Sequence, residues 1–455
     1  MGSIEDSVPS SILIIGSGVF GLSTAYALAQ RPSYAHTKIT VLDRSTFPAP
    51  DAASIDASRI VRADYSDYYY SALCIEAQKL WRQEWGAEGR YHENGLVIAV
   101  NSAEDAEAGG KREEMQREMM ANLKRLGLSV GKRKDGADVS LLENREAMIR
   151  IADGFDGAAG DAGYCNWTSG WADAEAAMKY LEKLARATGR IDFRNSEVGA
   201  LLFDHGSSTV KGVKLKDGSK IEADLLILAA GAWTPKFIDL RGVASASGQV
   251  LAYLDITAEE QAQLENNPTM LNGSNGMFII PPRERVLKVA RHGYGYANFK
   301  KIPHPEHPET GAEIEVSLPW TKIDDPHLHI PKEGSDACRD FLAQCIPHMA
   351  ERPWSYTRIC WYADTPKGDW LVDYHPKWKN LVVATGGSGH AYKFLPVIGE
   401  RIADVVVRET RDDLGKAMQE KWRWPKERSS SDHIWTNDWR GGRKGMLLDE
   451  ELARK

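Results

Sequence analysis

Three glycines near the start of the chain have the spacing of a nucleotide-binding turn. Gly16, Gly18 and Gly21 form a G-x-G-x-x-G pattern directly after an apolar run. In such a turn the first glycine allows a tight bend, the second admits a pyrophosphate, and the third lets a helix pack on a strand. Asp43 ends the next apolar segment, where a carboxylate can bond a ribose hydroxyl. The pattern therefore predicts a dinucleotide site.

This chemistry requires a strand, a turn and a helix in that order. Residues 11–30 (SILIIGSGVFGLSTAYALAQ) have the expected pattern, and their glycines argue against a membrane span of similar length. A buried strand near 225–230 ends at Gly231, after a short β-meander with a turn at Asp217-Gly218. Residues 380–407 repeat the order of strand, glycine-rich loop and helix. These segments predict one α/β domain.

Length, charge and cysteine content limit the possible functions. A chain of 455 residues is too long for one hydrophobic core, so we expect two closely joined domains. The net charge of −7 favours neither nucleic acid nor an anionic membrane as a partner. The five cysteines are scattered and odd in number, which predicts neither a disulfide framework nor a zinc site.

The two ends of the chain bear on its location. The N-terminal residues MGSIEDSVPS are polar and acidic, unlike a signal peptide. The final Ala-Arg-Lys only half resembles a peroxisomal address, because the central base fits and the last residue does not. We therefore expect a cytoplasmic or peroxisomal protein, and a monomer.

Four more side chains could do chemistry, although each has a plainer explanation. Cys360 lies in RICWYADTPKGDW, where a free cysteine is most often a packing residue. Arg59 and Arg62 lie three apart in SIDASRIVRADY, on one face if that segment is helical, and such pairs are often solvated. Lys288 in VLKVARHGYGY could simply extend from a strand edge into water.

The order of these motifs resembles one known family. The fingerprint is followed by AAGAW, then CWYADTP, then GGSGHAYKFLPVIG. The chain is thus similar, over roughly residues 10 to 425, to the monomeric sarcosine oxidase family, which includes fungal fructosyl amino acid oxidases and pipecolate and saccharopine oxidases. The resemblance implies an α/β fold in which an FAD-binding Rossmann-type domain is interleaved with a mostly antiparallel substrate domain. NAD is possible from the fingerprint alone, but the motifs of Cys360 and Lys393 favour FAD.

The domains are expected to be discontinuous. We predict an FAD-binding domain from residues 1–90, 155–245 and 355–425, a substrate domain from 91–154 and 246–354, and a loose polar extension over 426–455.

The resemblance also implies roles for individual residues. Cys360 would carry FAD through a thioether, and Arg59 would lie near the flavin. Arg62 and Lys393 would bind the substrate carboxylate, for which a planar guanidinium and a second cation are well suited. Lys288 would promote the reaction with oxygen. Further cofactor contacts are implied for Val19, Phe20, Arg44, Ser58, Gly387, Ser388 and Gly389, beside the fingerprint residues and Gly231.

Two pocket residues bear on the substrate. His292 and Tyr362 match an active-site histidine and tyrosine of the sarcosine type, whereas fructosyl amino acid oxidases tend to have an acid and a cysteine there. We therefore expect an oxidase of secondary amino acids that forms an imine and reduces O2 to hydrogen peroxide. The alternatives are a fructosyl amino acid oxidase, a flavin dehydrogenase with another electron acceptor, and a flavin-binding protein without turnover.

Overall fold

The computed structural model describes residues 8–107 and 109–454. Most of the polar N-terminal segment that argues against a signal peptide, and the final Lys455, lie outside the described residues. Within the described ranges, no helix combines the length and apolar character needed to cross a lipid bilayer.

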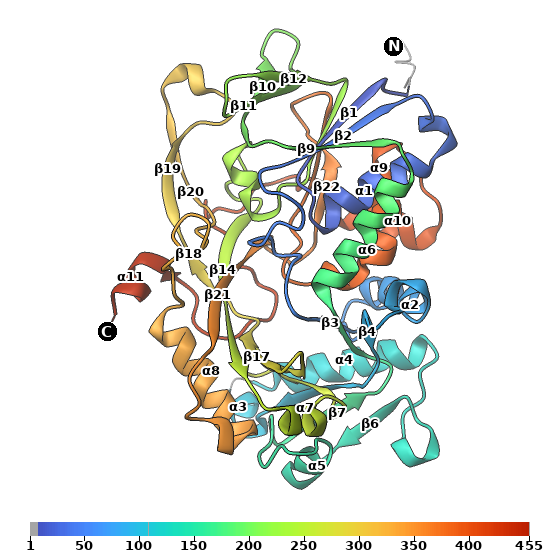
Figure 1. Cartoon of the computed structure of the whole chain (residues 1–455), viewed down its shortest axis with the longest axis vertical. Helices are drawn as coiled ribbons and strands as arrows, with labels where there is room; N and C mark the ends of the chain where they lie inside the picture. Colours follow the sequence, from blue (N-terminus) through green and yellow to red (C-terminus); the bar gives the residue numbers. More distant parts are fainter. Residues whose placement is uncertain (1–7, 108, 455) are drawn as a thin grey trace.

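A mostly parallel sheet has the glycine turn near its centre (Figure 1). Edge strand β22 runs antiparallel to β23, and the other neighbours are parallel. The strands, in order across the sheet, are β22 (Leu371–Tyr374), β23 (Leu381–Thr385), β13 (Leu225–Leu228), β1 (Ser11–Ile15), β2 (Lys38–Asp43) and β9 (Ile191–Asn195).

Both faces of this sheet are covered, which explains its nearly continuous apolar sequence. Alternate residues of a strand point to opposite faces, so Ile12 and Ile14 pack among the helices while Leu13 and Ile15 face the other way. The helices are α1 (Val19–Gln30), α6 (Ala174–Ala187) and α9 (Leu395–Val406). The predicted β-meander covers the second face and is confirmed as β10 (Val198–Asp204), β11 (Thr209–Leu215) and β12 (Lys220–Glu222).

A larger, mostly antiparallel sheet forms the second half of the molecule. The long neighbours β14 and β21 pair over their full common length, and α8 (Lys332–Cys345) packs against β14, β16 and β17. Its strands are, in order, β24 (Met446–Leu447), β18 (Tyr296–Ala297), β14 (Ser245–Asp255), β17 (Val286–Arg291), β16 (Met277–Arg283), β15 (Thr269–Asn272), β5 (Leu96–Val100), β7 (Ala162–Asn166) and β6 (Val139–Leu142), with β21 (Tyr356–Asp364) beside β14.

The remaining elements connect or cover these sheets. A small sheet of β3, β4 and β8 lies next to α2, and β19 pairs with β20 as a separate hairpin. The bounds are β3 (Arg59–Val61), β4 (Tyr91–His92), β8 (Gly170–Ala172), β19 (Phe299–Pro303), β20 (Glu313–Ser317), α2 (Tyr68–Trp81), α3 (Ser102–Glu107), α4 (Lys111–Arg125), α5 (Arg145–Arg150), α7 (Ala258–Leu264), α10 (Asp413–Lys421) and α11 (Leu448–Ala453).

The predicted fold class is confirmed, with the two sheets interleaved along the chain. The predicted domain boundaries remain a prediction. Strands β7 and β21 lie in segments assigned to the FAD-binding domain, but they pair within the antiparallel sheet. After β7 the chain continues through β8 and α6 to β9 of the parallel sheet, and after β21 it continues to β22, so each strand lies just before the chain returns to the parallel half.

The C-terminal residues are not a loose extension, and that prediction was wrong. Ile434, Arg440, Met446 and Leu448 are all buried, and β24 adds to the antiparallel sheet beside β18. The apolar residues there are few and fall in short groups, Ile434-Trp435 and Met446-Leu447-Leu448, separated by polar residues, so the segment as a whole shows neither a helical nor a strand period in the sequence. It packs through these short groups and through closely fitted glycines instead.

The possible helix around Arg59 and Arg62 is also not formed. Arg59 lies in β3, and Arg62 follows its last residue. The intervening Ile60 and Val61 are β-branched, which favours a strand. The two arginines nevertheless line the same cavity.

Candidate active site

The glycine turn has the geometry that its sequence predicts. Gly16 has φ +102°, and a Cβ there would lie 2.4 Å from the Ala229 carbonyl oxygen. A Cβ on Gly21 would lie 1.9 Å from the Gly16 oxygen, so helix and strand pack as closely as expected. A Cβ on Gly18 would have only Ser54 Oγ nearby, at 3.8 Å, so there is space beside this glycine for a ligand.

Asp43 lies at the end of β2 beside this turn. Its Oδ2 accepts hydrogen bonds from the backbone N–H of Ser17 at 2.8 Å and from Ser17 Oγ at 2.7 Å. Arg44, the next residue, pairs with Asp51 and lies over the Trp233 ring. Asp43 and Arg44 therefore form one end of the site, with one carboxylate fixing the turn.

A cavity of about 520 Å³ connects this turn with the chemically interesting residues. That volume lies in the range of about 300–1,000 Å³ that is common for small-molecule sites. The predicted residues that line it are Gly16, Gly18, Val19, Phe20, Asp43, Arg44, Arg59, Arg62, Gly231, Lys288, His292, Cys360, Tyr362, Gly387, Ser388, Gly389 and Lys393. Gly21 and Ser58 do not line it: Gly21 packs inside the turn, and the Ser58 carbonyl accepts a hydrogen bond from Lys288.

Cys360 differs from the other cysteines of the chain. It lies buried on β21 but lines the cavity, and its Sγ is 3.6 Å from Nη2 of Arg59. Burial raises the pKa of Cys74 and Cys338 to about 12, so those thiols are inert. All five cysteines are free thiols.

Lys288 belongs to a buried charge cluster. Its Nζ donates to Asp56 Oδ2 at 2.6 Å and to the Ser58 carbonyl at 2.9 Å. Asp56 also pairs with Arg59 and accepts a hydrogen bond from Tyr253 Oη at 2.6 Å. Burial, and then the charge of Arg59, lower the pKa of Lys288, but the adjacent carboxylate opposes that shift and favours the ammonium form. Two cations therefore share one acid at this wall.

Arg62 and Lys393 form a second cationic group without an acid partner in the described part of the chain. Lys393 Nζ donates to Tyr65 Oη at 2.8 Å and to the His390 carbonyl at 2.9 Å. The Arg62 guanidinium donates to the Asp64 carbonyl and lies over the Tyr65 ring. Burial, and then the charge of Arg62, lower the pKa of Lys393 to about 7. Such a group is suited to bind an anion.

His292 and Tyr362 are neutral neighbours of these cations. His292 Nδ1 lies 3.5 Å from Tyr362 Oη. Burial, and then Arg440, lower the pKa of His292 well below its ordinary value, while burial raises that of Tyr362. A Cβ on Gly389 would lie 2.3 Å from the Tyr362 ring, so the glycine loop packs directly on the tyrosine.

Residues 11–405 match the family model described as FAD dependent oxidoreductase. The chain belongs to that family. It is 32% identical, over 92% of its length and 98% of the relative, to the amino acid oxidase imqH of Aspergillus flavus. It is 29% identical to the L-saccharopine oxidase of Schizosaccharomyces pombe, with 93% and 95% of the two chains covered. The solved structure of Amadoriase I from Aspergillus fumigatus, a fructosyl amine:oxygen oxidoreductase, is 28% identical, covers 100% and 98% of the chains, and has a TM-score of 0.79.

The residues of this FAD dependent oxidoreductase fit the cofactor of the family. An elongated dinucleotide needs a turn for its central pyrophosphate and, farther along the cavity, room for a flat ring. The space at Gly18 meets the first need, and Gly231, at φ +54°, keeps the neighbouring wall open, because a Cβ added there would meet no atom within 4 Å. Gly16 and Cys360 line one continuous cavity, so the phosphate turn and the space beside Cys360 are connected.

Sequence reasoning missed several residues of the site. Asp56, Tyr253, Trp439 and Arg440 lie in or directly behind the cavity walls. Asp56 could have been noticed as an acid two residues before Ser58 and three before Arg59, because a cationic cluster in a dry site needs a counter-ion. Trp439 and Arg440 had no comparable signal, since they lie in a segment without periodicity.

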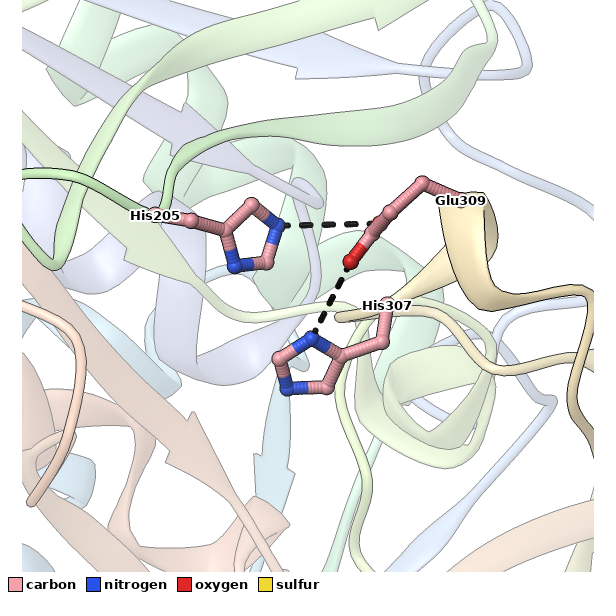
Figure 2. A group of neighbouring side chains, drawn as sticks. All are labelled: His205, His307 and Glu309. Carbon is pink, nitrogen blue, oxygen red and sulfur yellow. Dashed lines mark hydrogen bonds and ion pairs between the residues drawn. The ribbon is translucent and has the colours of Figure 1, made fainter.

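One group with metal-type ligands lies outside the cavity lining (Figure 2). His205 Nε2 is 3.7 Å and His307 Nδ1 is 3.4 Å from the carboxylate of Glu309. Lys377 Nζ lies 2.9 Å from His307 Nε2. A neutral imidazole has one accepting nitrogen, so a bond from Lys377 leaves the proton on Nδ1, directed at Glu309. We therefore interpret the group as a network of hydrogen bonds among surface side chains.

Proposed function

We propose that this enzyme is an FAD-dependent oxidase of secondary amino acids, of the N-methyl amino acid, pipecolate or saccharopine type. Its substrate would be oxidised at the C–N bond to an imine, and O2 would be reduced to hydrogen peroxide. The observation that carries the proposal is the pair of Arg62 and Lys393, two buried cations that face one cavity without an acid partner among the described residues. The named activity of the L-saccharopine oxidase relative supports it.

The protein would act mainly by positioning the substrate and by favouring the neutral form of its nitrogen. Arg62 and Lys393 would bind its carboxylate, since a guanidinium fork and an ammonium match two carboxylate oxygens. Their charge would disfavour the ammonium form of the substrate nitrogen, because like charges repel in a dry site. FAD, when bound, supplies the hydride acceptor and passes the electrons to oxygen.

No residue near the substrate position is required as a strong base. His292 stays neutral because burial and neighbouring cations lower its pKa, and Tyr362 keeps its proton because burial raises its pKa. We propose that both shape the pocket around the neutral amine. Lys288, held by Asp56, would supply positive charge that favours the reduction of oxygen.

We propose that Cys360 bonds covalently to FAD. We expect the yellow colour of the wild-type protein to stay in the pellet after acid precipitation, whereas Cys360→Ala releases it into the supernatant. Cys345→Ala is the matched control, because Cys345 is a buried core thiol that does not line the cavity. Release of all colour from the wild-type pellet would contradict the covalent bond.

Carboxylate binding should depend on pH through Lys393. We expect the Kd of acetate, which does not titrate above pH 6, to be constant below about pH 7 and to rise above it. The lysine is protonated below its pKa of about 7 in the empty site, so the attractive charge is lost as the pH increases. The neighbouring His390, with a pKa lowered to about 3 by burial and Lys393, does not titrate in this window. Lys393→Met should bind acetate weakly and without this pH dependence, as measured by calorimetric titration.

A fructosyl amino acid oxidase is the second candidate function. The overall likeness to Amadoriase I favours it. The site itself favours a substrate without a sugar, because His292 and Tyr362 stand where we expect such enzymes to carry an acid and a cysteine.

Peroxide release in air discriminates between these functions. The purified yellow protein should be assayed with sarcosine, longer N-methyl amino acids, L-pipecolate, L-saccharopine, fructosyl-valine and fructosyl-lysine. Peroxide from a secondary amino acid supports the proposal. Peroxide from the fructosyl compounds alone would reject it, and reduction of the enzyme without peroxide would indicate a dehydrogenase.

A further inference from the structure

The C-terminal residues 433–448, which we call the strap, form part of the active-site wall. The strap is anchored at several points along the substrate half of the molecule. His433 Nδ1 lies 2.6 Å from Ser245 Oγ, the Asn437 N–H donates to the Pro366 carbonyl at 2.8 Å, and β24 pairs with β18. The strap therefore has a defined path, and Trp439 is its residue that lines the cavity.

A further anchor, made of two backbone hydrogen bonds, lies next to His292. The Gly441 N–H donates to the His292 carbonyl at 2.9 Å, and the Tyr294 N–H donates back to the Gly441 carbonyl at 2.9 Å. A Cβ on Gly441 would lie 1.6 Å from the Asn275 carbonyl oxygen, so only glycine fits there. This contact fixes the two residues that precede Gly441.

Those two residues are Trp439 and Arg440. Arg440 is fully buried and donates to the Ser388 carbonyl at 3.0 Å and to Asp364 Oδ1 at 3.3 Å, in addition to pairing with Asp438. Trp439 is half-buried and lines the cavity, with its ring centroid 5.0 Å from that of His292. A rigid indole is thus presented to the substrate space.

The chemistry around Trp439 is apolar and cationic. Trp439 and Phe278 both pack against the hydrophobic cluster that contains Leu271, and all three side chains line the cavity. The acids that line the cavity, among the described residues, are Asp43, Asp51, Glu197 and Asp324, and each is already bonded by neighbours of its own. Two further acids, Asp64 and Asp438, lie close enough to oppose the lowering of the Lys393 pKa, and both are bonded by neighbours of their own.

We infer that the strap builds the side-chain subsite and that Trp439 selects a planar, apolar substrate side chain. This inference rests on the proposed function, because it takes Arg62 and Lys393 as the site of the carboxylate. Indole rings gain energy from offset or edge contacts with another aromatic ring beyond the burial of area. The substrate class is therefore an N-substituted or cyclic amino acid with an aromatic side chain.

The test compares two carboxylates that cannot be oxidised. Calorimetric titration of the FAD-loaded enzyme at pH 6.5 would give the Kd of acetate and of indole-3-acetate. We expect indole-3-acetate to bind at least roughly tenfold more tightly, as one aromatic contact and its buried area supply. Trp439→Phe should keep most of that preference, whereas Trp439→Leu, which removes the aromatic ring, should lower the ratio of the two Kd values to about one.

Trp435→Leu is the matched control, because Trp435 lies in the same strap but does not line the cavity. Full preference in Trp439→Leu would overturn the inference while leaving the carboxylate site intact. Failure of acetate to bind the wild type, or equal binding by Arg62→Met, would instead reject the proposed function. The two failures are therefore distinguishable.

Discussion

Replacing Arg62 by methionine is expected to lower kcat/KM for a carboxylate-bearing secondary amine by roughly 10²- to 10³-fold. This range lies within the roughly 30- to 5,000-fold that corresponds to about 2–5 kcal/mol for removing one partner of a desolvated charge contact. Most of the loss should appear in KM, with a smaller loss in kcat from poorer placement of the amine. Steady-state peroxide release measures both quantities.

The variant should still fold, because the groups around Arg62 keep other partners. Asp64 retains hydrogen bonds from Tyr164, Asn166 and Ser169. A substrate amine without a carboxylate should be oxidised by wild type and Arg62→Met at similar rates. Arg117→Met, on the exposed face of α4, is the neutral control. Equal losses for substrates with and without a carboxylate would show that Arg62 does not bind that group.

Replacing Lys288 by methionine is expected to slow the reaction of the reduced enzyme with O2 by roughly 10²- to 10³-fold, the usual effect of removing one preorganised charge. Reduction of the enzyme by substrate in the absence of air should change much less. Rapid mixing of substrate-reduced enzyme with oxygenated buffer separates the two steps.

Lys288→Met should not disturb the rest of the charge cluster, so its effect on the reaction can be assigned to the lysine. Without Lys288, Asp56 keeps its ion pair with Arg59 and its hydrogen bond from Tyr253, so no buried carboxylate is left alone. Lys301→Met, exposed on β19, is the matched control. Slow reduction with unchanged reoxidation would place Lys288 on the substrate side of the chemistry instead.

Local sequence patterns were sufficient to predict the strands and turns of the parallel half of the fold. The apolar run before Gly16 and the one before Asp43 each form a strand, because fully buried strands need continuous apolar residues. The β-meander around Gly218 also follows from its turn residues and alternation. These signals act over a few residues and are therefore readable in one chain.

Long-range packing was not readable in the same way. β21 pairs with β14, and Gly441 bonds to His292, across stretches of sequence far longer than any helical or strand period, so no local pattern records either contact. The roles of Cys360, Arg62, Lys288 and Lys393 came from family resemblance, whereas Asp56 and Trp439 required the folded chain. Residues that belong to a local motif could be proposed from the sequence, whereas residues that long-range contacts bring to the cavity could not.

The strap also affects when the site can form during synthesis. Gly16 and Trp439 line the same cavity from near opposite ends of the sequence. At roughly 5–20 residues per second, a ribosome needs about 20–90 s to make the whole chain. Until residues 433–448 have been made, the cavity lacks the wall that carries Trp439. A chain that stops before Trp439 would therefore have the fingerprint but not the finished site.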